Sequence, residues 1–352
     1  MTKTSIVYKA ALWPLFEKYV TDPLFRFVPK DIPANFLTVF GNCCAIFGTI
    51  CAWLSWKGIV QLWPLIPLMY FFYLVCDCWD GNQARRTNTP SIRGNFLDHF
   101  FDILIMGQIF LMDLFAWDIS SPLFVALLFC SGYLCMVGTY YELYYNRIMY
   151  FESISAFEMM LAGIILACIG FATDSHIHAM LMPAAKIVIY ASMLFAITSF
   201  MRPILRVRKA KKQRYLGLAR LGLYIIALVL TSFFIVTALP FPLAALSLLL
   251  YAASYVERFF LQGLFEKEAP WPDLLFTVLI ATLYFIDRNS VQLIAFTVFY
   301  QCAFILLLFV IGVSKCPGPQ VADIQEEIED PNNIADSLKL KLHAIRLFNH
   351  RR

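Results

Sequence analysis

The sequence predicts an all-α polytopic membrane protein with about ten transmembrane helices, cytoplasmic N- and C-termini, and an interfacial amphipathic helix ahead of the first span. Of its 352 residues, 60% are hydrophobic and only 15% are charged, whereas a soluble chain is typically about 45–50% apolar and about 25% charged. The apolar residues are gathered into long segments, and the basic residues lie mostly in alternate connections between those segments.

The predicted spans are the segments that approach the roughly 20 apolar residues needed to cross a bilayer. They are 36–56, 59–78, 99–117, 121–144, 156–172, 184–201, 216–239, 242–261, 272–287 and 290–313, of which the fifth and ninth are short. With a cytoplasmic N-terminus, all Lys and Arg residues except Lys57, Lys186 and Arg288 lie on the cytoplasmic side. This is the bias of the positive-inside rule. A missed or extra helix would scramble it, so an even number of spans is predicted.

Residues 1–35 form the predicted cytoplasmic interfacial segment. Apolar residues recur there at roughly helical spacing with lysines between them, as is typical of a helix on a membrane surface. They are Ile6, Val7, Ala10, Trp13, Phe16 and Val20. Pro23, Pro29 and Pro33 are expected to break the chain before the first span.

Two further segments are polar or basic. The loop Arg202–Arg214 is predicted to anchor the topology on an anionic leaflet, with the gathering of an anionic nucleotide as the alternative. Residues 314–352 are predicted to be a cytoplasmic tail. The net charge of +4 does not point to nucleic acid, so no nucleic-acid partner is expected, and a homodimer is left open.

Four aspartates flank the junction between the second and third predicted spans: Asp77, Asp80, Asp98 and Asp102. On helices, Asp77 and Asp80 share one face at a spacing of three, and Asp98 and Asp102 share another at a spacing of four. The segment 86–93 between them is polar and turn-like, so the helices can return antiparallel. The four carboxylates are therefore expected to converge at the cytoplasmic edge of the membrane.

Such a cluster needs positive charge, because an ionised carboxylate at mid-bilayer costs about 2.5–3.5 kcal/mol. Oxygen-only ligands suit Mg²⁺, Mn²⁺ or Ca²⁺ rather than zinc. Two divalent ions would balance the four charges and form a clamp for phosphoryl chemistry. Mg²⁺ or Mn²⁺, as two ions, is thus the predicted cofactor, with the four aspartates as its ligands.

Small residues share these helix faces. Gly81 and Ala84 follow Asp80, and Gly94 precedes Asp98 by one turn. They leave room for a ligand against the backbone, although close helix packing would also select small residues. Arg85 is expected to contact pyrophosphate oxygens, while Arg86 suits either that role or positive-inside anchoring.

These residues and their spacing resemble the signature of the CDP-alcohol phosphotransferases. The resemblance rests on Asp77, Asp80-Gly81, Ala84-Arg85, Gly94, Asp98 and Asp102, and it extends upstream to Asn35 and Thr38, where the family often places residues near the nucleotide. It implies that 36–201 is the catalytic helical core and that 202–313 adds further C-terminal transmembrane helices. Gly81, Ala84, Arg85, Gly94 and Asn35 are then the expected donor-binding residues.

Within the family, the segments 83–87 and 98–99, together with the number of spans, look most like the choline and ethanolamine phosphotransferases. This implies that phosphoethanolamine or phosphocholine is transferred from its CDP derivative to diacylglycerol, with release of CMP, at the cytoplasmic side of a membrane. The membrane would be endoplasmic reticulum or Golgi in a eukaryote and the inner membrane in a bacterium. Phe100, Phe101 and Asn82 depart from the branch pattern, so the head group stays open.

The resemblance also suggests residues for the head group and for proton transfer. Glu142, Tyr144 and Glu158 faintly echo the acidic-aromatic head-group region and could cage an ammonium group, although interfacial tyrosines and helix-end acids are the alternative. His99 would border the metal cluster from the next position on the helix, and an imidazole is a credible base for a lipid hydroxyl. Asp102 is expected to be a ligand, the base, or both.

Two other functions are weighed against this one. The chain could use another CDP-linked donor or acceptor, such as CDP-diacylglycerol with inositol, serine or glycerol phosphate. It could also be a cation-binding transporter, but that class places charges near mid-membrane in repeated halves. Here the acidic cluster lies at one edge and no repeat is visible.

Overall fold

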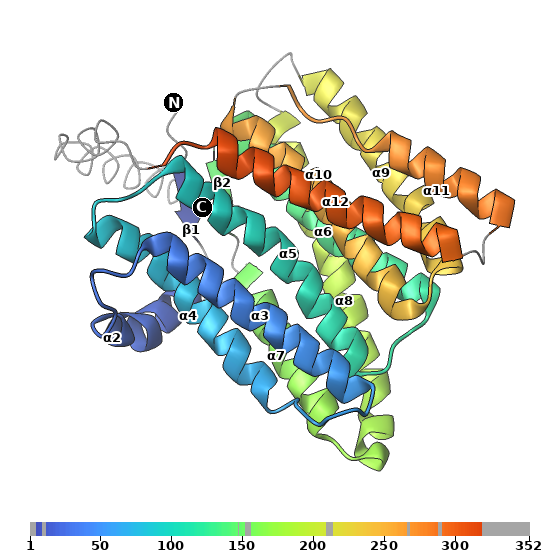
Figure 1. Cartoon of the computed structure of the whole chain (residues 1–352), viewed down its shortest axis with the longest axis horizontal. Helices are drawn as coiled ribbons and strands as arrows, with labels where there is room; N and C mark the ends of the chain where they lie inside the picture. Colours follow the sequence, from blue (N-terminus) through green and yellow to red (C-terminus); the bar gives the residue numbers. More distant parts are fainter. Residues whose placement is uncertain are drawn as a thin grey trace, which may run out of the picture.

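The computed structural model describes residues 5–8, 12–146, 148–151, 156–208, 214–265, 268–287 and 291–318. Within those ranges, ten helices of 14 to 34 residues form a single bundle (Figure 1). They are α3 (Ala34–Trp56), α4 (Leu65–Arg86), α5 (Ile92–Ala116), α6 (Pro122–Asn146), α7 (Ala156–Ala172), α8 (Ser175–Arg208), α9 (Arg214–Ala238), α10 (Phe241–Leu264), α11 (Leu274–Asp287) and α12 (Val291–Lys315).

Each predicted span falls on one of these helices, and the predicted polytopic all-α membrane fold is confirmed. Seven of the helices in the described part of the chain are long and apolar enough to cross a membrane, namely α3, α5, α6, α8, α9, α10 and α12. The helices α7 and α11 are apolar but shorter, as expected for the fifth and ninth spans. The helix α4 is 22 residues long, and its end carries the first half of the charged motif.

Several predicted boundaries were wrong by a few residues to two turns. The helix of the second predicted span, α4, begins at Leu65 rather than 59, because Gly58 turns the chain with a φ of 67° and Pro64 caps the helix. The helix of the sixth predicted span, α8, includes Pro183 and Pro203. A membrane helix tolerates proline when neighbouring groups satisfy the freed backbone carbonyls. The start of the predicted basic loop, 202–208, is therefore helical, and 209–213 lie outside the described residues, as do 319–352 of the tail.

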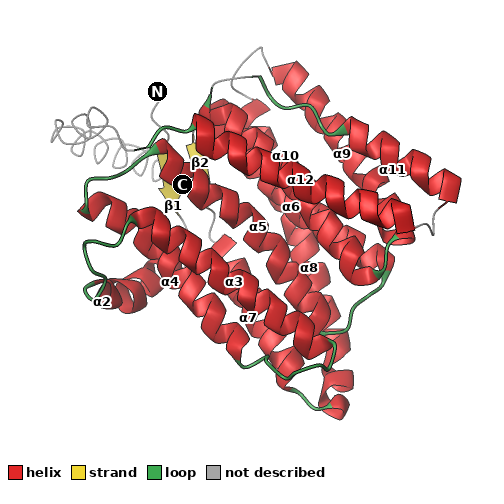
Figure 2. Ribbon diagram, in the orientation of Figure 1, coloured by secondary structure: helices red, strands yellow, loops and turns green. Residues whose placement is uncertain are grey.

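The N-terminal segment differs from the surface helix that was predicted, for which a kink at Pro14 had been considered. Residues Ser5–Tyr8 form a short strand, β1, which pairs in parallel with β2 (Ile148–Phe151) (Figure 2). Helical structure runs from Trp13 to Phe25 as α1 (Trp13–Phe16), a π-helical turn (Glu17–Thr21) and α2 (Asp22–Phe25). Pro14 and Pro23 lie in the first turns of α1 and α2, where proline removes no helical hydrogen bond. Pro23 therefore does not break the chain as expected.

The helices α3, α4 and α5 lie side by side and form the part of the bundle that carries the motif (Figure 1). A Cβ atom on Gly41 would lie 2.8 Å from Cβ of Cys76, so this glycine brings α3 and α4 into close contact. In addition to its contact with α3, α5 packs against α7 and α10, and α6 packs against α8 and α10. The contact of α10 with both α5 and α6 positions a C-terminal helix beside the motif.

The start of α3 and the end of α12 lie at the same end of the bundle. Asn35 at the start of α3 lies beside Gly94 at the start of α5. The backbone N–H of Arg93 donates to the carbonyl of Pro317, just after α12, at 3.1 Å, and Arg93 Nε donates to the carbonyl of Cys316 at 3.1 Å. This arrangement is expected when the chain crosses the bundle an even number of times between the start of α3 and the end of α12.

Candidate active site

A short turn joins α4 to α5, and both helices pack against α3. Thr87 Oγ1 donates to the carbonyl of Gln83 at 2.8 Å at the end of α4. Asn88 adopts a φ of 53°, a left-handed conformation that asparagine tolerates. Ser91 then caps α5, because its Oγ accepts the backbone N–H of Gly94 at 3.0 Å. These polar turn residues bring the two motif-bearing helix ends together.

The carboxylates of the motif form one cluster at this end of α4 and α5. Ligand atoms of Asp98, His99 and Asp102 lie within 4.8 Å of one another. Asp77 shares a side-chain hydrogen bond with Asp102 and is repelled by the charges of Asp98 and Asp80. Asp80 is in turn repelled by Asp102. Among the described residues, the group with ligand atoms spaced for a metal ion is Asp98, His99 and Asp102. Asp77 and Asp80 interact with this group through their charges.

Neighbouring hydroxyl groups orient two of the aspartates. Tyr73 of α4 donates its hydroxyl to Asp102 Oδ1 at 2.9 Å. Thr38 of α3 donates to Asp80 Oδ2 at 2.5 Å, and Asn42 Nδ2 donates to the carbonyl of Thr38 at 2.7 Å. Thr38 was expected near the nucleotide from the resemblance, and it lies directly against a predicted metal ligand.

The chemistry of this cluster fits a divalent cation. The donors are half-buried or buried carboxylate oxygens, which suit hard ions such as Mg²⁺ and Mn²⁺. Asp77 and Asp102 interact with each other, and a bound cation would offset the repulsion between the two carboxylates. Arg85 attracts Asp80, but it is exposed at the surface. Positive charge from ions is thus what the buried part of the cluster needs.

The two motif glycines have different surroundings. A Cβ atom on Gly81 would meet only the Arg85 guanidinium within 4 Å, at 3.5 Å from Nη1. A Cβ atom on Gly94 would meet Asn35 Oδ1 at 3.1 Å and Ser91 Oγ at 3.2 Å. Close helix packing therefore does not explain Gly81, and Gly94 leaves space for the amide of Asn35.

The two arginines at the end of α4 have different surroundings. Arg85 is exposed and donates from Nη2 to Asn82 Oδ1 at 2.6 Å, and the half-buried Ala84 precedes it. Arg86 instead donates to the carbonyl of Val28 at 2.7 Å, and its guanidinium lies 4.4 Å from the ring centre of Phe25. Arg86 therefore ties the N-terminal segment to α4, a third role beside the two considered from sequence.

Gln83 makes the same connection from the buried side of α4. Its Nε2 lies within hydrogen-bond distance of three carbonyl groups of the loop after α2, those of Pro29, Lys30 and Ile32, the last at 2.6 Å. The N-terminal segment is therefore fastened beside the motif by side chains of the motif helix itself.

His99 belongs to α5, and its side chain contacts residues of α6 and α10. Its Nδ1 is 3.3 Å from the hydroxyl of Tyr140, and its ring centre is 4.8 Å from that of Phe260 in an edge-to-face arrangement. The rings of Tyr140 and Phe260 are also in contact, at 5.6 Å. The imidazole is therefore held in one orientation beside Asp102.

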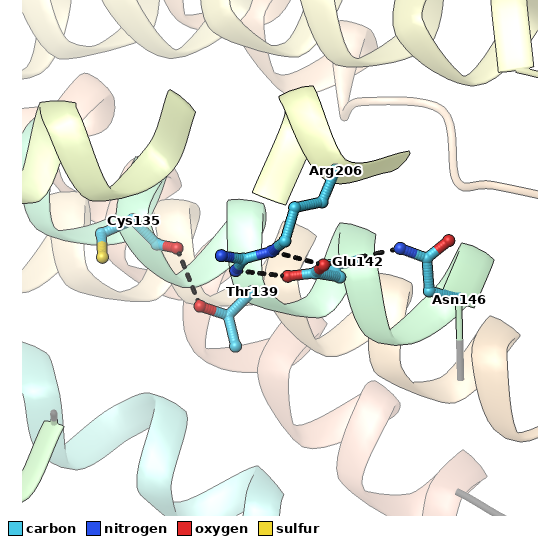
Figure 3. A network of polar contacts seen from close by, with 5 residues as sticks. All are labelled: Cys135, Thr139, Glu142, Asn146 and Arg206. Atoms are coloured by element: carbon cyan, nitrogen blue, oxygen red, sulfur yellow. Dashed lines mark hydrogen bonds and ion pairs between the residues drawn. The ribbon is translucent and has the colours of Figure 1, made fainter. Parts of the chain in front are cut away.

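Of the predicted head-group residues, Glu142 is engaged in an ion pair. Arg206 of α8 binds it in a bidentate fashion, with Nε to Oε1 and Nη2 to Oε2 both at 2.7 Å, and Asn146 lies nearby (Figure 3). The glutamate is 1% exposed. An ammonium group at this carboxylate would have to compete with a guanidinium.

The other two head-group candidates make separate contacts. The ring of Tyr144 packs against Tyr145 at 4.7 Å and Phe259 at 6.0 Å. Glu158, at the start of α7, accepts the backbone N–H of Leu12 at 2.8 Å. The described contacts therefore assign Glu142, Tyr144 and Glu158 to three different neighbourhoods.

Sequence reasoning missed Glu257, a buried glutamate on α10. It is fully buried, and the electrostatic interaction of its carboxylate with that of Asp102 links it to the cluster. A charged residue within a predicted span was the available signal, because such residues usually mark a functional site. Only the contact of α10 with α5 shows which site it belongs to.

The fold is that of an integral membrane protein, and acidic side chains gather near the junction of α4 and α5. The family model of the CDP-alcohol phosphatidyltransferases matches residues 32–314, and the chain belongs to this family. Its chemistry lies in phospholipid biosynthesis. The match begins just before α3 and ends within α12, so it extends beyond the predicted catalytic core at 36–201.

A curated relative shares a shorter segment. The chain is 34% identical over 86 residues to cholinephosphotransferase 1 of Rattus norvegicus, which covers 23% of this chain and 22% of the relative. The matched segment is thus about a fifth of the relative's length. This similarity points toward the choline and ethanolamine branch.

Proposed function

We propose that the protein transfers phosphocholine or phosphoethanolamine from the CDP derivative to diacylglycerol, releasing CMP. The observation that carries the proposal is the group of Asp98, His99 and Asp102, which interacts electrostatically with Asp77 and Asp80. The family match and the partial similarity to a cholinephosphotransferase support this donor class.

The four aspartates would hold two Mg²⁺ or Mn²⁺ ions. When bound, such ions neutralise a pyrophosphate and stabilise charge on its leaving oxygen. Tyr73 fixes the orientation of Asp102, which keeps an oxygen directed at the cluster. Acidic clusters without these ions would repel the donor, so divalent cation is a requirement of the proposal.

The donor would lie along α4 and the starts of α3 and α5. Gly81 and Gly94 let its pyrophosphate approach the backbone, Arg85 contributes positive charge at the exposed end, and the Asn35 amide offers hydrogen bonds next to Gly94. Ala84 lies one turn beyond Gly81 on the same helix face. CMP would leave toward the exposed end, which the positive-inside bias assigns to the cytoplasm.

Proton removal from the lipid hydroxyl would fall to His99 or Asp102. His99 pairs through Nδ1 with the hydroxyl of Tyr140, while Asp102 is shared with the metal cluster. A base must lie within hydrogen-bond reach of the proton that it takes, and both side chains border the same space.

An apolar groove between α4 and α7 supports a lipid acceptor. It has a volume of ≈ 510 Å³, and Leu74 and Phe71 line one wall while Leu161 and Ile164 line the other. Leu74 lies one turn from Asp77 on the same helix. An acyl chain in this groove would bring its hydroxyl toward the cluster.

Purified protein in lipid, supplied with Mg²⁺, diacylglycerol and a panel of CDP-alcohols, tests the function by release of CMP. Turnover of CDP-choline or CDP-ethanolamine that disappears on chelation and returns with Mg²⁺ or Mn²⁺ is expected. Turnover of CDP-diacylglycerol with inositol, serine or glycerol phosphate instead would refute the aminoalcohol assignment and favour the other donor class.

A further inference from the structure

A carboxylate from the C-terminal half of the chain reaches the cluster of the motif. Glu257 lies on α10, far from the motif in sequence, and its side chain is fully buried. Its charge acts on Asp102 of α5 and on the hydroxyl groups of Tyr133 and Tyr140 of α6. The glutamate therefore faces the interface that α10 forms with α5 and α6.

Both carboxylate oxygens of Glu257 lack a hydrogen-bond partner among the described residues. The nearby hydroxyls are used elsewhere, since Tyr133 donates to the carbonyl of Ile103 at 3.0 Å and Tyr140 pairs with His99 at 3.3 Å. Buried acids are normally paired with a cation or fully hydrogen-bonded. An unpartnered one in a membrane helix points to a ligand that supplies the missing partner.

The groups around Glu257 suit a cation. Phe260 lies one turn further along the same face of α10, and its ring contacts those of Tyr140 and His99 at 5.6 and 4.8 Å. Aromatic rings beside a carboxylate bind ammonium groups through cation–π attraction and charge. An anionic or neutral group would leave the charge of Glu257 uncompensated.

We propose that Glu257, with the rings of Tyr140 and Phe260, forms the subsite for the ammonium group of the aminoalcohol donor. The proposal rests on the proposed function, because only a CDP-aminoalcohol carries this cation. In such a donor a short carbon linker separates the ammonium from the reacting phosphoryl group. Glu257 interacts electrostatically with Asp102, so the subsite lies on the side of the cluster, whereas the carboxylate of Glu142 is already paired with Arg206.

The test compares CDP-choline with a neutral isostere, the CDP ester of 3,3-dimethylbutanol, in which carbon replaces the quaternary nitrogen. KM values and the thermal stabilisation by each nucleotide are measured for the full-length wild type and for Glu257→Gln. In the variant, the KM of CDP-choline should rise about 10–100-fold, the usual worth of a contact to a charged group. The KM of the neutral isostere and the stabilisation by CMP should change by less than about threefold.

Asp113→Asn is the matched control, because Asp113 is also a buried acid with an unpartnered oxygen among the described residues. It lies on α5 about 16 Å along the axis from Asp102, at 1.5 Å per residue. This variant should keep the wild-type preference for CDP-choline over the neutral isostere.

Equal changes for both donors in Glu257→Gln, or no change for either, would overturn the proposal. So would a wild type that binds the two donors equally, a result that needs no folded variant. If CDP-aminoalcohols are turned over but Glu257→Gln keeps the preference for CDP-choline over the neutral isostere, the proposed function is supported and the Glu257 subsite is refuted. If the wild type turns over only donors without an ammonium group, both the proposed function and the subsite are refuted.

Discussion

Replacing Gly81 with alanine separates a packing role from a ligand-binding role. The new methyl group would lie 3.5 Å from the Arg85 guanidinium, which is an ordinary van der Waals distance. No other helix approaches this position within 4 Å. Alanine also favours a helix over glycine by about 1 kcal/mol, so Gly81→Ala should be as stable as the wild type or slightly more stable.

The same substitution at Gly41 is the matched control. Its Cβ would lie 2.8 Å from Cβ of Cys76, so the two helices would have to move apart. Overpacking of this kind typically costs about 1–3 kcal/mol. Gly41→Ala should therefore lower the melting temperature, while Gly81→Ala should not.

The effect on catalysis should be reversed. In the proposed site the donor pyrophosphate lies against Gly81, and a methyl group there would displace the reacting phosphorus by about 1 Å. Misplacement on that scale can cost about 10²-fold in rate. We expect kcat/KM for the CDP-alcohol to fall by that order in Gly81→Ala, measured as CMP release beside a thermal unfolding curve of the same preparation.

Two results would refute this reasoning. A loss of thermal stability in Gly81→Ala similar to that in Gly41→Ala would mean that Gly81 serves helix packing. Wild-type kcat/KM in a stable Gly81→Ala would mean that the donor does not approach the backbone there.

Three further predictions address the cluster and its neighbours. Asp80→Asn should abolish CMP release while the protein stays folded in detergent, because Thr38 can still donate to the amide oxygen; near wild-type turnover would end the metal-ligand assignment. His99→Ala should reduce turnover by about 10²–10⁴-fold, the range of general-base catalysis, with CDP-alcohol binding retained by isothermal titration; loss of binding as well would point to a role in holding the donor. Glu142→Gln should lower the unfolding free energy by about 1–3 kcal/mol, because Arg206 loses a charged, bidentate partner; a raised KM for the CDP-aminoalcohol at unchanged stability would instead favour the predicted head-group role.

The pattern of apolar and polar residues along the sequence was enough to locate the helices and to predict which motif residues share a helix face. A bilayer imposes a length on each spanning helix, and backbone groups in lipid must be satisfied within the helix. The positions of the spans could therefore be read from apolar segments, and α7 matches its predicted range. The neighbourhood of Asp77, Asp80, Asp98 and Asp102 also followed from helical spacing and a polar turn, since residues three or four apart share a face.

Boundaries were less predictable because capping and proline effects compete locally. The predicted third span began at 99, but Ser91 caps α5 eight residues earlier. Asp98 thus lies almost two turns inside the helix rather than at its start. The N-terminal helix was drawn too far upstream, because Ser5–Tyr8 pairs with a strand distant in sequence, and apolar spacing alone does not reveal such a partner.

The sequence by itself determined the membrane class, the helix count and the acidic motif, because each depends on residues close together along the chain. Only the tertiary structure decided the partners across helices: Arg206 for Glu142, the loop after α2 for Gln83 and Arg86, and the motif cluster for Glu257. Helical periodicity states which residues of one helix share a face, but it does not state which other helix that face meets. The packing of α10 against α5 and α6 supplies that information, and it brings the charge of Glu257 to act on Asp102.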